Sequence, residues 1–164
     1  MERIDPKLLA EYILGKIGDM PHLKLQKLLY YVNAWHLANF DEPLFDEEFE
    51  AWVHGPVLRS VWNEYKDVLG LMTVNNVVCV SEDIKAKVDQ SIKRLLLPDQ
   101  IELIDDVLDE YGVETAYRLE CYTHSETPWR EARNGLGPTD VCTGHISTAT
   151  TREYYKERLM TIDE

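Results

Sequence analysis

The sequence of 164 residues has few cysteines and no long apolar run. Its three cysteines, Cys79, Cys121 and Cys142, form no CxxC pair, and the N-terminus lacks the apolar core of a signal peptide, so no disulfide framework is expected. No stretch approaches the roughly 20 apolar residues of a membrane span. We therefore expect a cytoplasmic protein with reduced thiols and no membrane partner.

The sequence also lacks glycine-rich nucleotide loops, an HExxH pair and basic runs interleaved with aromatic residues. Thirty acidic against seventeen basic residues give a net charge of −13, which repels nucleic acid. These features argue against nucleotide-binding, metalloprotease and nucleic-acid-binding functions, and no cofactor is predicted. The charge is sufficiently explained by solubility, but a basic protein is its best-matched partner.

The chain is organised around the segment LKLQKLLYYVNAWHLAN, residues 23–39. Its apolar residues recur at i, i+3, i+4 and i+7, which predicts a helix with a buried face. Further apolar residues fall on the opposite arc, so the helix is expected to be buried on two sides. Lys24, Lys27 and Tyr31 form a polar stripe between these faces. The lysines either pair within the fold or bind an acidic partner or anion, and internal pairing is the simpler interpretation.

Shorter elements are predicted around this helix. Caps, prolines and apolar spacing indicate helices at about residues 6–17, 56–65, 82–96, 98–111, 115–122 and 128–132, and from about residue 148. Alternation over residues 49–54 predicts a strand that ends at Gly55-Pro56, and residues 73–80 are a hairpin or a loop with a strand after it. The predicted fold class is mainly α: a single compact helical domain, residues 1–164, around a central buried helix, with a small β-hairpin or short sheet.

Three stretches together resemble one known family. They are LKLQKLLYY at 23–31, EAW running into HGPV within 50–57, and THSETPW at 123–129. In this order and spacing they resemble the SocA-like, or Panacea, antitoxin domain, and the resemblance runs from about residue 5 to about residue 158. It implies a bacterial or prophage antitoxin that binds and neutralises a toxin encoded by the neighbouring gene. In one group of members the resemblance also implies delivery of the toxin to a Clp-type protease.

An antitoxin that acts by direct binding needs no catalytic residue, so no enzyme activity is predicted. Many members of the family add a DNA-binding segment, but this chain has no basic region for one, and repression of its own promoter is not expected. Exposed aromatic and basic residues are the usual anchors of protein interfaces. The toxin-binding candidates are Lys24, Lys27, Tyr31, His54, Trp129 and Arg133.

Other functions stay open. Lys27, His54 and His124 would be the polar groups of a pocket in an enzyme that reverses the toxin's modification. A third possibility is an adaptor that delivers a partner protein to a protease. An acidic mimic of nucleic acid is a more distant alternative. The run Thr123-His124-Ser125-Glu126 is not read as a catalytic triad, because triads assemble in space rather than in a row. A capped turn with Trp129 filling a gap is the better interpretation.

A zinc site is a further alternative. Cys121-x-x-His124 and Cys142-x-x-His145 offer two cysteines and two histidines, which is a ligand set for tetrahedral zinc. Such pairs arise easily by chance, so the hypothesis depends on ligand type and number alone.

Overall fold

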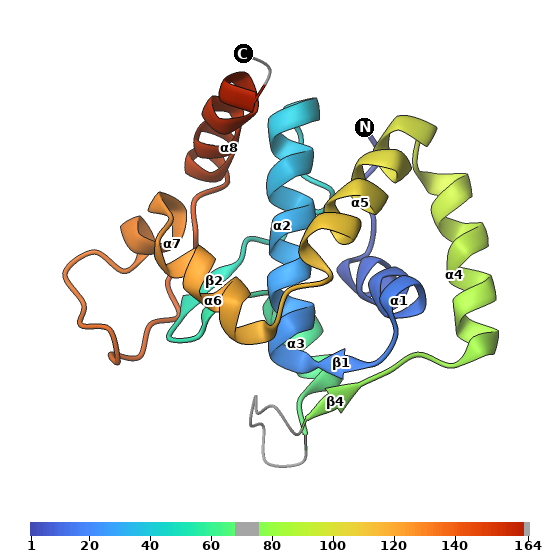
Figure 1. The fold of residues 1–164 in the computed structure, drawn as a ribbon, viewed down its shortest axis with the longest axis horizontal. Coiled ribbons are helices and arrows are strands. Elements are labelled where there is room, and N and C mark those ends of the chain that lie inside the picture. Colours follow the sequence, from blue (N-terminus) through green and yellow to red (C-terminus); the bar gives the residue numbers. More distant parts are fainter. Residues whose placement is uncertain (68–75, 163–164) are drawn as a thin grey trace.

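The computed structural model describes residues 1–67 and 76–162, which form eight helices and two small two-stranded sheets (Figure 1). The helices are α1 (Pro6–Ile17), α2 (His22–Phe40), α3 (Arg59–Tyr65), α4 (Glu82–Leu95), α5 (Pro98–Tyr111), α6 (Ala116–His124), α7 (Thr127–Ala132) and α8 (Thr148–Ile162). The strands are β1 (Met20–Pro21), β2 (Glu50–Trp52), β3 (Gly55–Val57) and β4 (Val77–Val78). The predicted class, mainly α with a small β element, is confirmed.

Helix α2 runs through the middle of the molecule and contacts α1, α5, α6 and α8 (Figure 1). The side chains of its predicted apolar face, from Leu25 to Val32, are buried, and so are Tyr30, Ala34 and Leu37 on the opposite arc. The prediction of a helix that is buried on two sides is therefore confirmed. Each fully buried leucine or valine among them contributes about 1.5 to 3 kcal/mol to folding.

Burial on all sides forces the polar side chains of α2 to find partners inside the protein. The Gln26 side-chain oxygen accepts a hydrogen bond from the backbone N–H of Leu58 at 2.8 Å. The Asn33 side-chain oxygen accepts one from the backbone N–H of Leu44 at 2.9 Å. Each bond contributes about 1 kcal/mol, and losing one partner leaves a buried group unpaired. Helix α2 thereby fixes the paths of two loops.

The prediction that Gly55-Pro56 ends a strand and begins a helix is wrong. Strands β2 and β3 form an antiparallel hairpin in which Ala51 lies opposite Pro56, and α3 begins only at Arg59. Gly55 turns the chain because its φ of +106° belongs to the region that favours glycine. Proline is tolerated in β3 because a two-stranded sheet leaves edge positions whose N–H is not needed. The carbonyl of Pro56 accepts a hydrogen bond from the Lys27 side chain of α2.

The second sheet joins segments that are distant in the sequence. Met20 and Pro21 of β1 lie opposite Val78 and Val77 of β4. The sequence predicted a hairpin or a loop with a strand after it at residues 73–80; residues 77–78 form that strand, and residues 73–75 lie outside the described residues. The partner of β4 is therefore β1, just before α2, and not a strand next to it in the sequence.

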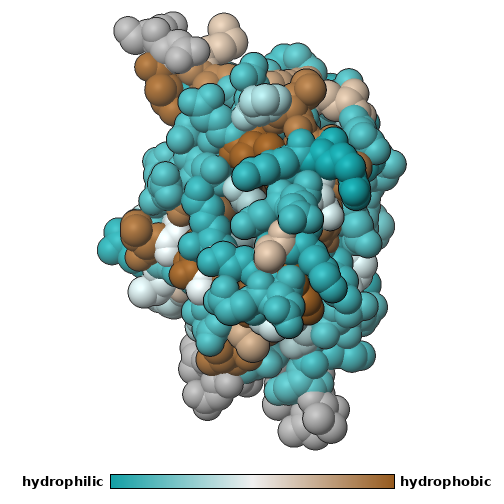
Figure 2. Space-filling model, turned by 90° about the vertical axis from the view of Figure 1, so that its right-hand side faces the viewer, coloured by the Kyte–Doolittle hydropathy of each residue, from teal (hydrophilic) through white to brown (hydrophobic). Residues whose placement is uncertain are grey.

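Helix α4 covers one side of the molecule and packs on α1 and α5. Its buried residues, Val88 and Ile92, face inward, and Ser81 caps its N-terminus as predicted. Figure 2 shows that this side of the surface is predominantly hydrophilic, with apolar residues in separate patches. Among residues 1–67 and 76–162, no helix has both the length and the apolar character that a membrane crossing needs.

Candidate functional site

Residues 23–31 and 123–129, two of the three stretches that carry the family resemblance, meet at the carboxylate of Glu126. The Tyr31 hydroxyl of α2 donates a hydrogen bond to one carboxylate oxygen at 2.8 Å, and the Tyr155 hydroxyl of α8 donates to the other. Glu126 occupies the N-cap position of α7, so Thr127 is the first helical residue rather than the predicted cap. Both tyrosines are fully buried, and only 8% of the Glu126 surface is exposed. The carboxylate therefore joins three helices.

Burial determines the protonation of this cluster. It raises the pKa of Glu126, while the hydrogen bonds from Tyr155 and Tyr31 and the charge of Arg158 act in the opposite direction. Burial, together with the neighbouring Glu126, also raises the pKa of Tyr31, and burial raises that of Tyr155. The tyrosines are therefore protonated at neutral pH and act as donors to the carboxylate.

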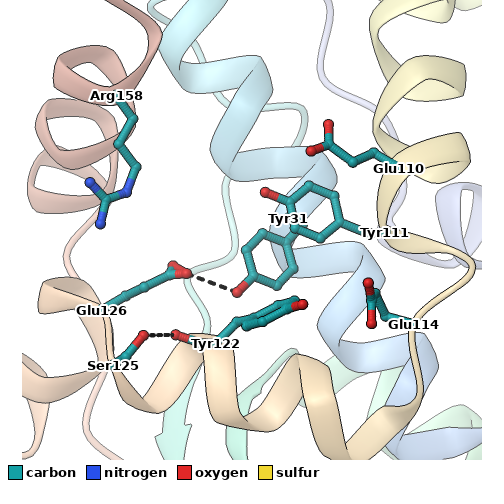
Figure 3. A pocket seen from close by; sticks show the side chains of 8 residues that line it. All are labelled: Tyr31, Glu110, Tyr111, Glu114, Tyr122, Ser125, Glu126 and Arg158. Atoms are coloured by element: carbon teal, nitrogen blue, oxygen red, sulfur yellow. Dashed lines mark hydrogen bonds between the residues drawn. The ribbon is translucent and has the colours of Figure 1, made fainter. Parts of the chain in front are cut away.

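Tyr31 and Glu126 of this cluster form part of the wall of a cavity of about 300 Å³ (Figure 3). The rings of Tyr31 and Tyr111 stack in this wall with centroids 4.2 Å apart and planes within 12°. Arg158 extends from α8 toward Glu126 on the other side of the cavity (Figure 3). The cavity is lined by Tyr31, Glu110, Tyr111, Glu114, Tyr122, Ser125, Glu126 and Arg158. We call it the tyrosine pocket.

A second polar cluster lies under the β2–β3 hairpin. Lys27 is fully buried, and its amine donates one hydrogen bond of 3.3 Å to the carbonyl of Pro56. Burial lowers the pKa of Lys27 to about 7, although the charge of Glu120 partly opposes this shift. The lysine stem also fills the space beside Gly55, where an added Cβ would lie 2.5 Å from the lysine Cε.

The three polar groups of the enzyme hypothesis gather around one carboxylate. The His54 Nδ1 atom lies 2.8 Å from Glu120 Oε1, and the His124 Nε2 atom lies 3.7 Å from the same oxygen. Lys27 is close enough to feel the charge of Glu120. A substrate in solution does not reach this amine in the structure, because Lys27 is fully buried.

Trp129 and His124 also contact each other and the β2–β3 hairpin. Their rings stack with centroids 4.0 Å apart, and the Trp129 indole N–H donates to the carbonyl of Trp52 at 2.8 Å. Burial lowers the pKa of His124, which favours the neutral imidazole. The predicted turn is shorter than residues 123–129: α6 runs to His124 and α7 begins at Thr127, so only residues 125 and 126 join the two helices, and Trp129 is buried.

The remaining cationic candidates bind backbone carbonyls. Arg133 is 4% exposed and donates to the carbonyls of Ala51, Gly137 and Asp140. The Lys24 amine donates to the carbonyl of Gly112 at 2.6 Å. Both lysines of the α2 stripe thus donate to backbone carbonyls inside the protein, Lys27 through a single long hydrogen bond.

Most of the six toxin-binding candidates are therefore not exposed anchors. Lys27, Tyr31, Trp129 and Arg133 are buried, so the expectation of exposed side chains is wrong for these four. Lys24 is half-buried, and His54 is exposed. The physical reason is that α2 is covered on all sides and that the hairpin needs internal partners for its carbonyls.

The zinc hypothesis gains no support from the geometry. Within the described part of the chain, no three His, Cys, Asp or Glu side chains converge as metal ligands. His124 faces Trp129, and His145 lies 3.7 Å from Glu48. Cys121 is exposed and Cys142 is half-buried, and both are free thiols.

Comparison with known proteins agrees with the motifs. Residues 25–130 match the family described as "Antitoxin SocA-like, Panacea domain", a range that contains most of α2, the hairpin and Glu126. Antitoxin SocA of Caulobacter vibrioides (strain NA1000 / CB15N) is 30% identical over 141 residues, which cover 83% of this chain and 74% of that protein. No solved structure gives a significant match. The resemblance seen in the sequence is confirmed, and the chain belongs to the SocA-like, Panacea-domain family of antitoxins.

Proposed function

We propose that this chain neutralises a toxin by direct, stoichiometric binding in the cytoplasm. An antitoxin role in general follows from the family. The observation that carries binding rather than chemistry is the burial of Lys27, the amine that the enzyme hypothesis needs. It is fully enclosed and donates to the carbonyl of Pro56.

The charge of the chain supports a basic toxin as the partner. A net charge of −13 accelerates encounter with a basic protein and adds electrostatic complementarity to the interface. Glu110 and Glu114 bring part of this charge to the tyrosine pocket. The candidate for the toxin is the product of the neighbouring gene.

Co-expression with the neighbouring gene tests this proposal. We expect the neighbour alone to arrest growth, this chain to relieve the arrest only at near-equal amounts, and the two proteins to elute as one complex whose mass is the sum of its parts. Protection by stoichiometric binding requires an amount of antitoxin that matches the toxin. An expression series of this chain against constant toxin, followed by size exclusion with mass determination, measures both quantities.

Two results would contradict stoichiometric binding. Relief of growth by a small fraction of the toxin's amount, without a complex, indicates an enzyme that reverses the toxin's modification. A shortened lifetime of the toxin in cells with an active Clp protease indicates an adaptor. A pulse-chase of the toxin in the presence and absence of this chain separates the adaptor from simple blocking.

A further inference from the structure

We propose that the tyrosine pocket receives an arginine side chain of the toxin. This inference rests on the proposed function and names its contact. Its first support is charge: the pocket lining contains Glu110, Glu114 and Glu126 and one cationic side chain, Arg158. Arg118, outside the lining, forms an ion pair with Glu114 at 3.1 Å, which leaves Glu110 and Glu126 without an ion pair among the described residues. The excess of carboxylates favours a cation and disfavours phosphate or carboxylate ligands.

The second support is the state of the buried carboxylate. Glu126 is more than nine-tenths buried, yet among the described residues it forms no ion pair, only hydrogen bonds from two neutral hydroxyls. A carboxylate accepts about four hydrogen bonds, so lone pairs remain beyond the two that Tyr31 and Tyr155 use. A guanidinium beside Glu126 would replace the hydration that the carboxylate loses on burial.

The third support is the aromatic surface. The half-buried rings of Tyr111 and Tyr122 provide faces that attract a cation, and the buried ring of Tyr31 stacks on Tyr111. Arginine is favoured over lysine because its planar guanidinium both stacks on a ring and binds a carboxylate with two parallel hydrogen bonds. The protein makes a contact of this kind beside the pocket, where the Arg158 guanidinium lies 3.9 Å from the centroid of the Tyr154 ring.

The size of the pocket restricts what it holds. About 300 Å³ is at the lower end of the volumes of ligand pockets, so it suits one long side chain better than a nucleotide or a large cofactor. The rim residues Glu110 and Glu114 approach the pocket from the end of α5 and the turn after it (Figure 3).

A peptide titration tests the chemistry of the pocket on the full chain. The probes are acetyl-Gly-Arg-Gly-amide and the matched peptide with citrulline, which has the same shape without the charge. We expect saturable NMR shifts around Tyr31 and Tyr111 with the arginine peptide, with a Kd of about 1 mM because one side chain supplies limited binding energy. The proposal is overturned if the two peptides act alike, or if no saturation occurs up to about 50 mM.

A charge-matched pair of variants tests the use of the pocket by the toxin. Glu110→Gln removes one charge from the rim, whereas Asp109→Asn removes one exposed charge of α5 outside the pocket lining. We expect the rim variant to weaken both the arginine peptide and the toxin at least about tenfold, and the control to change little, because a good charge-assisted contact contributes about 1.5 to 3 kcal/mol.

The outcomes separate this inference from the proposed function. If the wild type and the control bind the toxin and the rim variant binds it equally well, the inference is overturned and the proposed function stands. If the wild type does not bind the toxin at all, the proposed function is overturned, and with it the assignment of the pocket to a toxin residue. Tighter binding of free spermidine than of the arginine peptide would assign the pocket to a polyamine instead and overturn the inference.

Discussion

Lys27→Met is expected to raise the free energy of unfolding at pH 7 by about 1 to 4 kcal/mol, the range seen when buried ionic groups are replaced by apolar ones of similar volume. Lys27 is fully buried, and its amine has one long hydrogen bond, to Pro56. The fall of its pKa from 10.5 to about 7 corresponds to about 5 kcal/mol of cost for the buried charge. Methionine keeps the length of the side chain and removes that cost, at the loss of the bond to Pro56.

The same variant should remove a pH dependence. Below pH 7 both states carry the charged amine, and the native state bears the full cost of burying it. Between pH 7 and 10.5 the native state releases this proton while the unfolded chain keeps it, so stability rises with pH. From pH 7 to 9 the rise attributable to Lys27 is about 2 kcal/mol, and Lys27→Met should lack it. Denaturant unfolding at several pH values up to 9 measures the difference.

An exposed lysine provides the control. Lys87→Met makes the same chemical change on the outer surface of α4, so it should leave both the stability and its slope with pH almost unchanged. The explanation by burial would be refuted if Lys27→Met kept the slope of the wild type. Measurements stop at pH 9 because Tyr30 and Tyr31 have raised pKa values in the native state, so ionisation of tyrosine in the unfolded chain opposes the effect at higher pH.

Gly55→Ala is expected to destabilise the protein by about 2 to 4 kcal/mol, the sum of backbone strain and overpacking. Its φ of +106° strains any residue that carries a Cβ. The new Cβ would also lie 2.5 Å from Lys27 Cε and 2.9 Å from Thr123 Oγ1. Because both neighbours are buried, the hairpin has to move away from α2. Thermal and denaturant unfolding measure the loss.

Gly18→Ala is the matched control for this prediction. Gly18 has the same φ of +106°, but nothing lies within 4 Å of its added Cβ. It should therefore show the backbone strain alone, about 1 to 2 kcal/mol. Equal losses in the two variants would mean that the contact with Lys27 contributes nothing, contrary to the geometry.

Local patterns predicted the helices well because the signals lie within each segment. The apolar spacing of residues 23–39 marked α2, Ser81 marked the start of α4, and Pro98 marked the start of α5. The same local reasoning failed at Gly55-Pro56, since a glycine followed by a proline fits both the start of a helix and the return strand of a hairpin. Long-range packing against Lys27 and Thr123 decided between them.

The candidate site was only partly predictable. Tyr31, Lys27 and Trp129 were singled out from their motifs. The complete burial of Lys27 was not predicted, because charged side chains are rarely enclosed. Glu126 was read as part of a capped turn, and Tyr155 was not singled out within the helix predicted from about residue 148. Their pairing depends on contacts between residues far apart in the sequence, such as Tyr31 with Glu126, and no local pattern reports such contacts.

The docking of α8 on α2 has a consequence for synthesis. Tyr155 packs against Tyr31 and closes the Glu126 cluster, although more than 100 positions separate it from α2 in the sequence. A ribosome makes about 5 to 20 residues per second, so the central helix emerges several seconds before the segment that covers it. During that interval α8 does not yet cover α2, so the apolar surface of the central helix is accessible on the nascent chain.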